Sequence, residues 1–406
     1  MKSVLNFLRR CSAVIVGVVF FTSGVLKLMD PVGTGLIVAE WLKFFHLGFL
    51  GGLAKFIGVV LAIVEGVTGA ALITGVYRSL TGRLATALTG FFTIVTLILW
   101  IGNPQMDCGC FGEALHLTHF QSFAKNVVLL GLCLAAFVPF SGGQPARFRK
   151  KAAFWVVTAS LAGLCIYSLV RIPLVDFTPF NTSSRLAAAE GSVQDEYVAG
   201  FVYEKGGQRG VFTLDRLPDS TWTYVETIDM KKQDHIAETS FPVLSITDAE
   251  GNYRDSLAAG DMVMTVSVYA PAKVGRKMMA SAVRMLSKAD SLGFTPLMLI
   301  AGTADDLEDA IVRTGLGADE SDFLRRNTFF ADYKTLISLN RSNGGAVYFN
   351  AGNLIKKWSA RSYPADRKLA RYCRNEATEL AISASADGRV AFQAFFLYSF
   401  IVLFLL

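Results

Sequence analysis

Two cysteines, Cys108 and Cys110, flank a single glycine in the segment Asp-Cys-Gly-Cys-Phe-Gly-Glu. A bridge between thiols this close would close a very small ring, and strained, exposed disulfides are the oxidising, labile ones. Gly109 would give the backbone the freedom to close that ring. The pair could therefore take electrons from an outside thiol and pass them to a membrane carrier, with a quinone as the candidate acceptor. A static bridge and two buried, reduced thiols are the structural alternatives.

A metal site is another interpretation of the same segment. Cys108, Cys110, His116 and His119 offer two sulfur and two nitrogen ligands, the set that zinc favours in structural sites. Their spacing, Cys-x-Cys-x5-His-x2-His, is not that of a standard zinc finger, so we expect no metal here. Covalent haem is not indicated either, because the chain has no Cys-x-x-Cys-His motif.

An acidic residue, Glu65, lies deep inside an apolar segment. At about 1.5 Å per helical residue it would sit near the middle of a bilayer, where a charge is costly unless it is paired or protonated. Glu65 could accept a proton from a quinone reaction, or it could be a protonated group that is hydrogen-bonded inside a bundle. Lys27 is the natural cationic partner, although its long side chain could also reach the membrane surface.

The other cysteines are poorer candidates for chemistry. Three of them, Cys11, Cys133 and Cys165, lie in apolar segments, where a free thiol behaves as a small hydrophobic group. The fourth, Cys373, lies in the more polar second half of the chain. The Cys108–Cys110 pair is therefore the predicted reactive centre.

Composition places these residues in a membrane protein. Of the 406 residues, 52% are hydrophobic and only 18% are charged, against about 25% charged in average soluble chains. Six apolar segments are long enough, or nearly so, to cross a bilayer. They are Cys11–Lys27, Ala54–Val76, Leu84–Ile101, Phe120–Phe140, Ala152–Val170 and Val390–Leu406. We expect the apolar segment Leu36–Leu50 to form a helix in the membrane interface, with a re-entrant segment as the alternative.

Basic residues occupy alternate gaps between these segments, so the positive-inside rule predicts the orientation. The basic gaps contain Lys2, Arg9, Arg10, Arg78, Arg83, Arg147, Arg149, Lys150 and Lys151. We therefore expect a multi-pass protein of the bacterial inner membrane with both termini in the cytoplasm, and residues 172–389 and the cysteine pair outside. Since these residues do not line one face, we expect no nucleic-acid partner.

The large outer segment has ordinary soluble composition. Tyr197–Glu204 and Arg209–Leu214 read as a β-hairpin, and Leu217–Ser220 as a turn. From Phe241 we predict a strand, a helix and a strand, then a helix over Asp305–Thr314, and finally two strands and a helix. This order, β-α-β and then β-β-α, resembles a thioredoxin fold. The resemblance covers about 135 residues. In that family Cys-x-x-Cys follows the first strand, whereas Tyr269–Gly275 has no sulfur. No proline precedes the late strand at Ser342–Ala346 either, so we predict a thioredoxin-like domain without dithiol chemistry.

The membrane half resembles a known family. The motifs that carry the resemblance are Phe21-x-x-Gly24-x-x-Lys27 with Asp30-Pro31, Glu65-x3-Gly69, the Cys-Gly-Cys-Phe-Gly string, and Lys125-Asn126 at the head of an apolar run. Together they are similar to the DoxX superfamily, and within it to MauE, the methylamine utilisation membrane protein. The resemblance implies a four-helix membrane bundle with a role in electron transfer or disulfide formation on exported proteins. It makes Lys27, Gly109 and Asn126 structural candidates.

The predicted organisation is a membrane helical bundle plus a soluble α/β domain. We expect a DoxX/MauE-like domain at 1–140, a loop and fifth helix at 141–172, a β-rich linker region at 173–239, a thioredoxin-like domain at 240–389 and a last helix at 390–406. Two functions fit. In the first, Cys108, Cys110 and Glu65 oxidise an exported thiol-containing client, with a quinone as acceptor. In the second, the bundle is a non-enzymatic scaffold whose redox-inactive outer domain binds a partner in an envelope complex.

Overall fold

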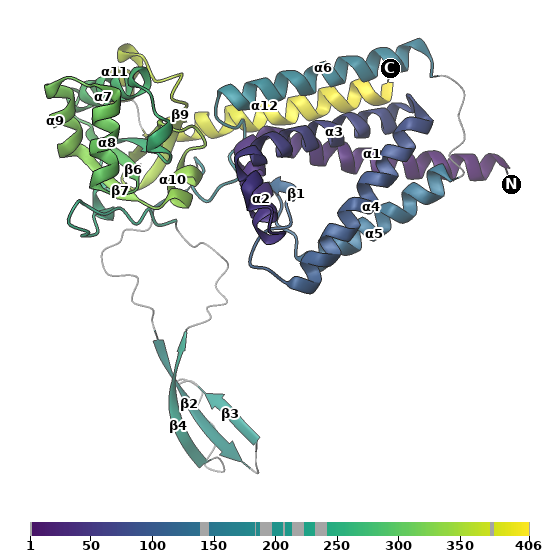
Figure 1. Cartoon of the computed structure of the whole chain (residues 1–406), viewed down its shortest axis with the longest axis horizontal. Helices are drawn as coiled ribbons and strands as arrows, with labels where there is room; N and C mark the ends of the chain where they lie inside the picture. Colours follow the sequence, from purple (N-terminus) through teal and green to yellow (C-terminus); the bar gives the residue numbers. More distant parts are fainter. Residues whose placement is uncertain are drawn as a thin grey trace.

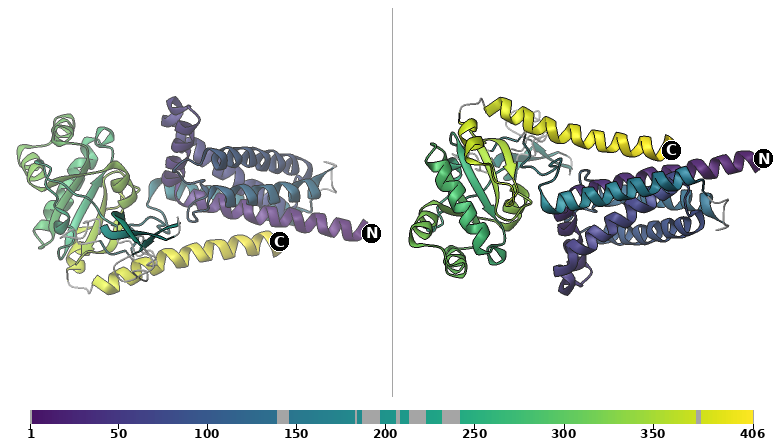
Figure 2. Two further views of the ribbon diagram at one scale, coloured as in Figure 1. Left: turned by 90° about the horizontal axis from the view of Figure 1, so that it is seen from below. Right: turned by 90° about the horizontal axis from the view of Figure 1, so that it is seen from above.

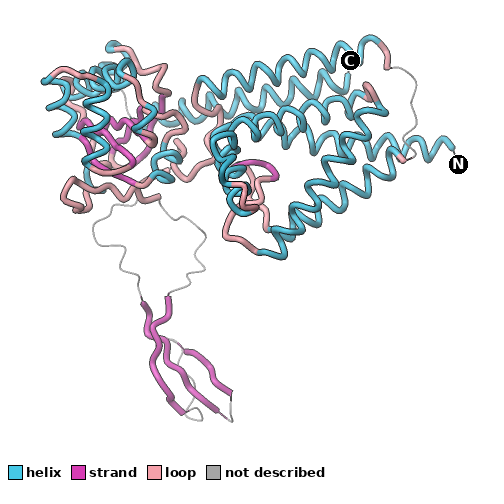
Figure 3. Tube along the Cα trace, in the orientation of Figure 1, coloured by secondary structure: helices cyan, strands magenta, loops and turns pink. Residues whose placement is uncertain are grey.

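The computed structural model describes residues 2–138, 146–182, 184–186, 197–205, 208–212, 223–231, 242–373 and 377–405. A bundle of long helices lies beside a compact domain of helices and strands, and a small separate sheet lies between them in the sequence (Figure 1). Strands are concentrated in that domain and the small sheet, with one short strand, β1, at an end of the bundle (Figure 3).

Among the residues that the structure describes, six helices are long and apolar enough to cross a membrane, as predicted. They are α1 (Lys2–Met29), α3 (Ala54–Thr74), α4 (Arg78–Gly102), α5 (His119–Phe137), α6 (Phe148–Val170) and α12 (Ala377–Leu405). The last helix begins at Ala377, well before the expected Val390, because the preceding segment is rich in alanine and other helix formers. The chain is therefore a multi-pass membrane protein by the length and composition of its helices.

Glycines let α1 and α3 approach very closely. A Cβ atom added at Gly24 of α1 would lie only 2.6 Å from the Cα atom of Gly66 in α3. One added at Gly69 of α3 would lie 2.7 Å from the Cα atom of Phe21. Small residues favour such contacts between membrane helices because backbones can then pack directly against each other. This packing sets the polar residues of α1 against those of α3.

The segment expected at the interface is helical. Helix α2 (Pro31–Phe44) runs across the long helices, and a short 3-10 helix, η1 (Gly48–Leu53), leads into α3 (Figure 1). Asp30 caps α2 by accepting a hydrogen bond from the Gly33 amide at 2.8 Å. In η1 the side chain of Phe49 is 81% exposed, which suits contact with lipid.

Basic residues gather at one end of the bundle. Arg10 donates a hydrogen bond to the carbonyl of Leu72 at 3.1 Å, and Arg78 donates one to the carbonyl of Ala136 at 3.2 Å. These carbonyls belong to the last turns of α3 and α5, where the helix dipole favours cations. Both chain termini lie at the end of the bundle away from the sheet domain (Figures 1 and 2).

The compact domain is built on a mixed five-stranded sheet of order β7-β6-β5-β8-β9. Strands β5, β6 and β7 run parallel to one another. Strand β8 is antiparallel to β5, and β9 is antiparallel to β8. The strands are β5 (Val263–Val268), β6 (Thr295–Ala301), β7 (Thr328–Ala331), β8 (Gly345–Asn350) and β9 (Asn353–Trp358). Four of them were predicted; β7 was not, because it is short and directly follows a helix.

Alternate residues of the strands serve two separate cores. Val266 of β5 and Tyr348 of β8 belong to a cluster with residues of α7 (Arg276–Asp290), whereas Val263 and Val347 belong to one with α10 (Tyr333–Leu339). Alternation of this kind is what a strand buried on both faces requires. The remaining helices are α8 (Ala304–Thr314), α9 (Ala318–Asn327) and α11 (Asp366–Tyr372). Three helices of this domain, α7, α8 and α11, were predicted, whereas α9 and α10 were not.

The small sheet has the order β3-β2-β4 and is antiparallel throughout. Its strands are β2 (Tyr197–Lys205), β3 (Gln208–Phe212) and β4 (Thr223–Lys231). Pairing of Lys205 with Gln208 confirms the predicted hairpin. The turn predicted at Leu217–Ser220 lies outside the described residues.

Candidate functional site

The cysteine segment lies at the end of the bundle that faces the sheet domain, between α4 and β1 (Cys110–Glu113). Gly109 has a φ of +65°, in the left-handed region that disfavours residues with a Cβ. A Cβ atom at this position would also collide with the side chain of Ile37 in α2. Glycine between the two cysteines is therefore required by the backbone turn and by its contact with α2.

Cys108 is paired with a histidine. Its Sγ lies 2.8 Å from Nδ1 of His119, the first residue of α5, and only 2% of Cys108 is exposed. The other ring nitrogen, Nε2, lies 2.9 Å from the carbonyl oxygen of Pro104. A carbonyl only accepts hydrogen bonds, so Nε2 carries a proton and donates it. In the neutral ring, Nδ1 is then free to accept the proton of the Cys108 thiol.

The surroundings of Cys108 favour the neutral thiol over the thiolate. Burial raises the pKa of Cys108, while the nearby Ser122 hydroxyl and the Lys125 ammonium act in the opposite direction. A buried thiol with a raised pKa is a weak nucleophile unless a base takes its proton as it reacts. His119 is in the position to be that base.

Cys110 is half-buried and is also a free thiol in the structure. Its carbonyl oxygen lies 2.7 Å from the Ser23 hydroxyl of α1. The same hydroxyl lies 2.6 Å from Oε2 of Glu65 in α3. A hydroxyl has one proton to donate, so Ser23 donates to an ionised Glu65 or to the Cys110 carbonyl, but not fully to both. Ser23 therefore links the acidic residue of the membrane core to the cysteine segment.

Glu65 and Lys27 form a buried ion pair. The Lys27 Nζ lies 2.7 Å and 2.9 Å from the two carboxylate oxygens of Glu65, and the two side chains are 6% and 3% exposed. Lys27 was the partner considered for Glu65 from the sequence. Its Nζ also lies 5.5 Å from the centre of the Phe92 ring, within range of a cation–π interaction. Each charge thus has the other as its main compensation in an apolar environment.

A small cavity is lined by most of these groups, although not by His119. Cys108, Cys110, Lys27 and Glu65 line it together with Asn126 of α5, and its volume is about 30 Å³. That is space for one or two water molecules, and a quinone ring does not fit. Asn126 donates to the Phe92 carbonyl at 3.3 Å and to the Thr96 hydroxyl at 3.2 Å. It thereby ties α5 to α4 at the edge of the cavity.

The four residues considered as zinc ligands are not all brought together, because His116 lies apart from Cys108 and His119. His116 points to Asp107, with 3.1 Å between its Nδ1 and the Oδ2 of Asp107, and both side chains are more than half exposed. Within the described part of the chain, no group of three or more His, Cys, Asp or Glu side chains is arranged to hold a metal ion. His119 instead belongs to Cys108. Sequence reasoning assigned His119 only to metal binding and missed this pairing.

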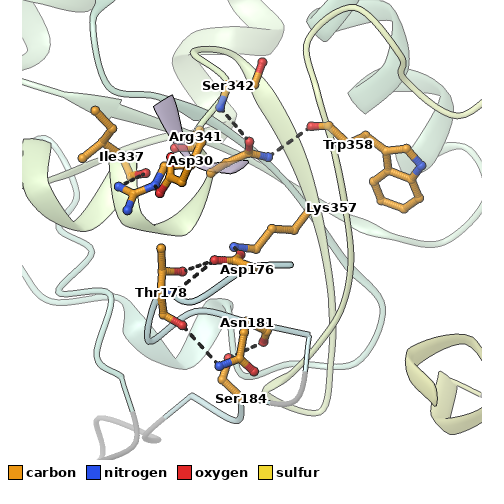
Figure 4. Close-up of polar contacts among 12 residues, drawn as sticks. Asp30, Asp176, Thr178, Asn181, Ser184, Ile337, Arg341, Ser342, Lys357 and Trp358 are labelled. Atoms are coloured by element: carbon orange, nitrogen blue, oxygen red, sulfur yellow. Dashed lines mark hydrogen bonds and ion pairs between the residues drawn. The ribbon is translucent and has the colours of Figure 1, made fainter. Parts of the chain in front are cut away.

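The sheet domain contacts the cysteine segment through Arg341. Its side chain is 4% exposed, and its Nε lies 2.8 Å from Oδ2 of Asp30 (Figure 4). Its Nη2 lies 3.1 Å from Oε1 of Glu113, the last residue of β1. Burial raises the pKa of Glu113 and the Arg341 charge opposes that shift. A single cation therefore holds the cap of α2 and the end of the strand that begins at Cys110.

A second buried contact joins β9 to the segment that follows α6. Lys357 donates to Oδ2 of Asp176 at 2.5 Å (Figure 4). Asp176 also accepts, through its other oxygen, from the amide and the hydroxyl of Thr178 at 3.0 Å and 2.7 Å. Burial lowers the pKa of Lys357, and Asp176 opposes the shift. The sheet domain is thus attached to the bundle end by paired charges.

The sheet domain carries no thiol at the predicted dithiol position. The loop Tyr269–Gly275 is held instead by Asn343, whose Oδ1 accepts from the amide of Ala270 and whose Nδ2 donates to its carbonyl, both at 3.0 Å. Cys373 is elsewhere, with its Sγ 3.4 Å from the Leu369 carbonyl. This arrangement offers no dithiol chemistry at the loop.

Comparison with known proteins identifies the membrane half. The family model of the methylamine utilisation protein MauE matches residues 5–139, a range that contains the bundle helices α1 to α5, the cysteine pair and Glu65. A family model described as a domain of unknown function (DUF8463) matches residues 197–233, the small sheet. No curated protein and no solved structure matches the chain. Residues 5–139 are therefore similar to the MauE family, and the chain also carries a separate domain with a mixed five-stranded sheet.

Proposed function

We propose that this protein carries out thiol–disulfide exchange at the end of the membrane bundle, with Cys108 and Cys110 as the reacting pair. The observation that carries the proposal is the 2.8 Å contact between the Cys108 sulfur and the unprotonated nitrogen of His119. A buried thiol beside a properly oriented imidazole is an arrangement for moving a proton to and from sulfur.

The exchange step balances as follows. A client thiolate attacks the sulfur of Cys110 in the Cys108–Cys110 disulfide, because Cys110 is the more exposed of the two. As the bond breaks, His119, which carries on Nδ1 the proton lost by the attacking client thiol, gives that proton to the leaving sulfur of Cys108. The second client thiol then displaces Cys110, which leaves as a thiolate and takes up the proton that this thiol loses. The client is oxidised to a disulfide, and the pair gains two electrons and two protons.

Glu65 lies next to the reacting pair through Ser23. The Ser23 hydroxyl contacts both the Glu65 carboxylate and the backbone carbonyl oxygen of Cys110. This contact links Glu65 to the cysteine segment, although it does not reach the Cys110 sulfur. We therefore propose that Glu65 takes up protons released in the cavity that it shares with the two cysteines, with Lys27 as its ion-pair partner.

Re-oxidation of the pair needs a two-electron acceptor, for which the sequence suggested a quinone. The cavity beside the pair has a free volume of about 30 Å³, which is too small for a quinone ring. We accordingly derive no step through a quinone, and the acceptor stays a prediction. We also propose that the membrane half is related to the wider DoxX superfamily.

The location of the reaction follows from charge. Arg10 and Arg78 bind helix ends at one end of the bundle, and the cysteine segment lies at the other. If the basic end faces the cytoplasm, then the pair and the sheet domain face the outer side of the bacterial inner membrane. Disulfides persist in that compartment, and exported thiol proteins are the clients available there.

For the sheet domain we propose a thioredoxin-like fold without redox chemistry. The strand order β7-β6-β5-β8-β9, with a parallel β-α-β unit followed by an antiparallel pair, supports that assignment. The sulfur-free loop Tyr269–Gly275 supports the second candidate function as well. In that function the domain binds a partner in an envelope complex and the bundle is only its anchor.

A single-turnover assay separates the two functions. The oxidised protein, reconstituted in vesicles, is mixed with a peptide that contains two thiols, and formation of the peptide disulfide is followed by mass spectrometry. Exchange predicts one equivalent of peptide disulfide from the wild type and none from Cys108→Ser or Cys110→Ser. The control is Cys373→Ser, which should match the wild type. An unaltered yield from a variant that lacks both cysteines of the pair would leave only the scaffold.

A further inference from the structure

A large cavity lies between the bundle and the sheet domain, beside the sulfur-free loop Tyr269–Gly275. Its volume is about 860 Å³, within the range of small-molecule sites. Residues from the ends of α3 and α6 form one wall, and residues around the start of α7 form the other. The thiol cavity described above is a different space with different walls, although Asp30 and Arg341 connect the two regions.

The walls of this cavity carry a surplus of positive charge. Arg341 is compensated by Asp30 and Glu113. Four further cations line the cavity and make no ion pair within the part of the chain that the structure describes; they are Lys55, Arg171, Lys277 and Arg361. Gathering like charges around one space costs free energy unless an anion occupies it. The cavity therefore favours a negatively charged ligand.

Uncharged donors point to the same kind of ligand. Helix α7 begins beside the cavity, and Gly275 at its N-cap position provides no side chain to cap the free amides of the first turn. Helix starts of this kind bind phosphate and other oxyanions. Ser168 of α6 also lines the cavity; it is 4% exposed, and its hydroxyl has no hydrogen-bond partner among the described residues. A buried hydroxyl without a partner is a further unused donor.

The cavity is placed where lipid headgroups would lie. Lys55 is the second residue of α3, and Arg171 directly follows the last residue of α6. Leu169 and Val170, at the end of α6, also line the cavity and are 43% and 38% exposed. Apolar side chains thus continue from the charged space down the outer surface of a candidate membrane span. A soluble anion would gain nothing from that surface, whereas acyl chains would.

We propose that this cavity binds the phosphate of an anionic phospholipid, with its acyl chains along the end of α6. Lys277 and Arg361 reach the phosphate from the sheet domain, and Lys55 and Arg171 reach it from the bundle. The lipid then acts as a neutralising contact between the two parts of the chain.

Native mass spectrometry of the full chain tests the proposal. The protein is purified in mild detergent with equal amounts of phosphatidylglycerol and phosphatidylcholine, and the retained lipid is counted. We expect the wild type to retain one phosphatidylglycerol in preference to phosphatidylcholine. The variant Lys277→Glu/Arg361→Glu should bind it at least about tenfold more weakly. The matched control is Arg367→Glu/Lys368→Glu, which reverses two exposed charges of the same domain outside the cavity and should behave as the wild type.

Folding and ligand source are tested separately. The variant Arg171→Gln, on the bundle wall, should also reduce retention, and circular dichroism shows whether each variant keeps its helices. Equal retention of the two lipids by the wild type, or undiminished retention by a folded Lys277→Glu/Arg361→Glu variant, would overturn the proposal. Displacement of phosphatidylglycerol by millimolar inorganic phosphate would overturn the assignment to a lipid in favour of a soluble anion.

Discussion

Two loops of this protein run into the start of a helix, and they differ in what they carry. The loop before α5 brings Cys108 to His119 at 2.8 Å. The loop before α7, Tyr269–Gly275, contains no sulfur and is held by Asn343. The first loop has a nucleophile and a base, and the second has cations and free amides around a large cavity. The comparison matches the two proposals made above, which place thiol exchange in the bundle and anion binding beside the loop before α7.

A buried ion pair of the bundle and an exposed pair of the sheet domain differ in what they contribute to stability. In the bundle, Lys27 and Glu65 are 6% and 3% exposed and depend on each other. In the sheet domain, Arg325 and Glu308 make a close pair in which both side chains are 47% exposed. Exposed pairs contribute little because water already solvates each charge, whereas breaking a buried pair leaves an uncompensated charge.

The largest expected effect is the loss of one charge from the buried pair. Lys27→Met should lower the free energy of unfolding by about 3–5 kcal/mol, because Glu65 is left buried without a cation. The double variant Lys27→Met/Glu65→Gln should recover most of that loss. Denaturant unfolding of the purified protein in detergent measures both. The control Arg325→Met, in the exposed pair, should change little. A double variant as unstable as the single one would show that the charges do not act as a pair.

The next effect concerns His119. We expect His119→Ala to slow exchange by about 100-fold or more, because the base that moves the Cys108 proton is lost. Asn343→Ala, the matched change at the other loop, should leave the rate unaltered. Similar losses from both variants would contradict the division between the two loops.

The pH dependence of the Cys108 reaction tests the cysteine loop further. Burial disfavours the anion and raises the pKa of Cys108, so its thiolate forms only above the ordinary thiol range. In His119→Ala, the alkylation rate of reduced Cys108 should therefore rise with pH, and the midpoint of that rise should lie above about pH 8.5. The alkylation rate is measured by quenched-flow labelling and mass spectrometry. A midpoint below that of a free thiol would show that the surroundings stabilise the thiolate.

The smallest expected effect is at Gly109. Gly109→Ala places a Cβ in a left-handed backbone, with φ at +65°, and against Ile37. We expect a loss of about 1–3 kcal/mol in the free energy of unfolding and slower exchange. Gly131→Ala in α5, where a Cβ meets nothing within 4 Å, is the control and should be neutral or slightly stabilising. If Gly109→Ala and Gly131→Ala had the same free energy of unfolding and the same exchange rate, glycine would not be required at position 109.

Much of the bundle could be predicted from the sequence because its signals are local. Runs of apolar residues gave the six spans, and a lone acid deep in one span pointed to Lys27 as its partner. The central strands of the sheet domain were predicted for the same reason, since β5 is rich in valine and is buried at every position. The three-stranded sheet was predicted only as far as its hairpin.

The contacts that join distant parts of the chain could not be predicted. Arg341 meets Asp30 across 311 positions of sequence, and neither residue carries a local signal of that pairing. The contact between Cys108 and His119 depends on how the loop after α4 folds back onto the start of α5. The available signal was a histidine shortly after the cysteines, at the beginning of an apolar run. It was interpreted as a metal ligand and not as a partner of Cys108.

The most direct test of the proposed exchange is the thiol state of Cys108 and Cys110 in membranes of living cells. Samples are trapped with acid, labelled with a maleimide and resolved by mass spectrometry, with and without an added two-thiol client. A reacting pair should be partly oxidised, and the client should shift it toward the reduced form in the wild type but much more slowly in His119→Ala. A pair that is fully bridged or fully reduced in every condition would contradict exchange at this site.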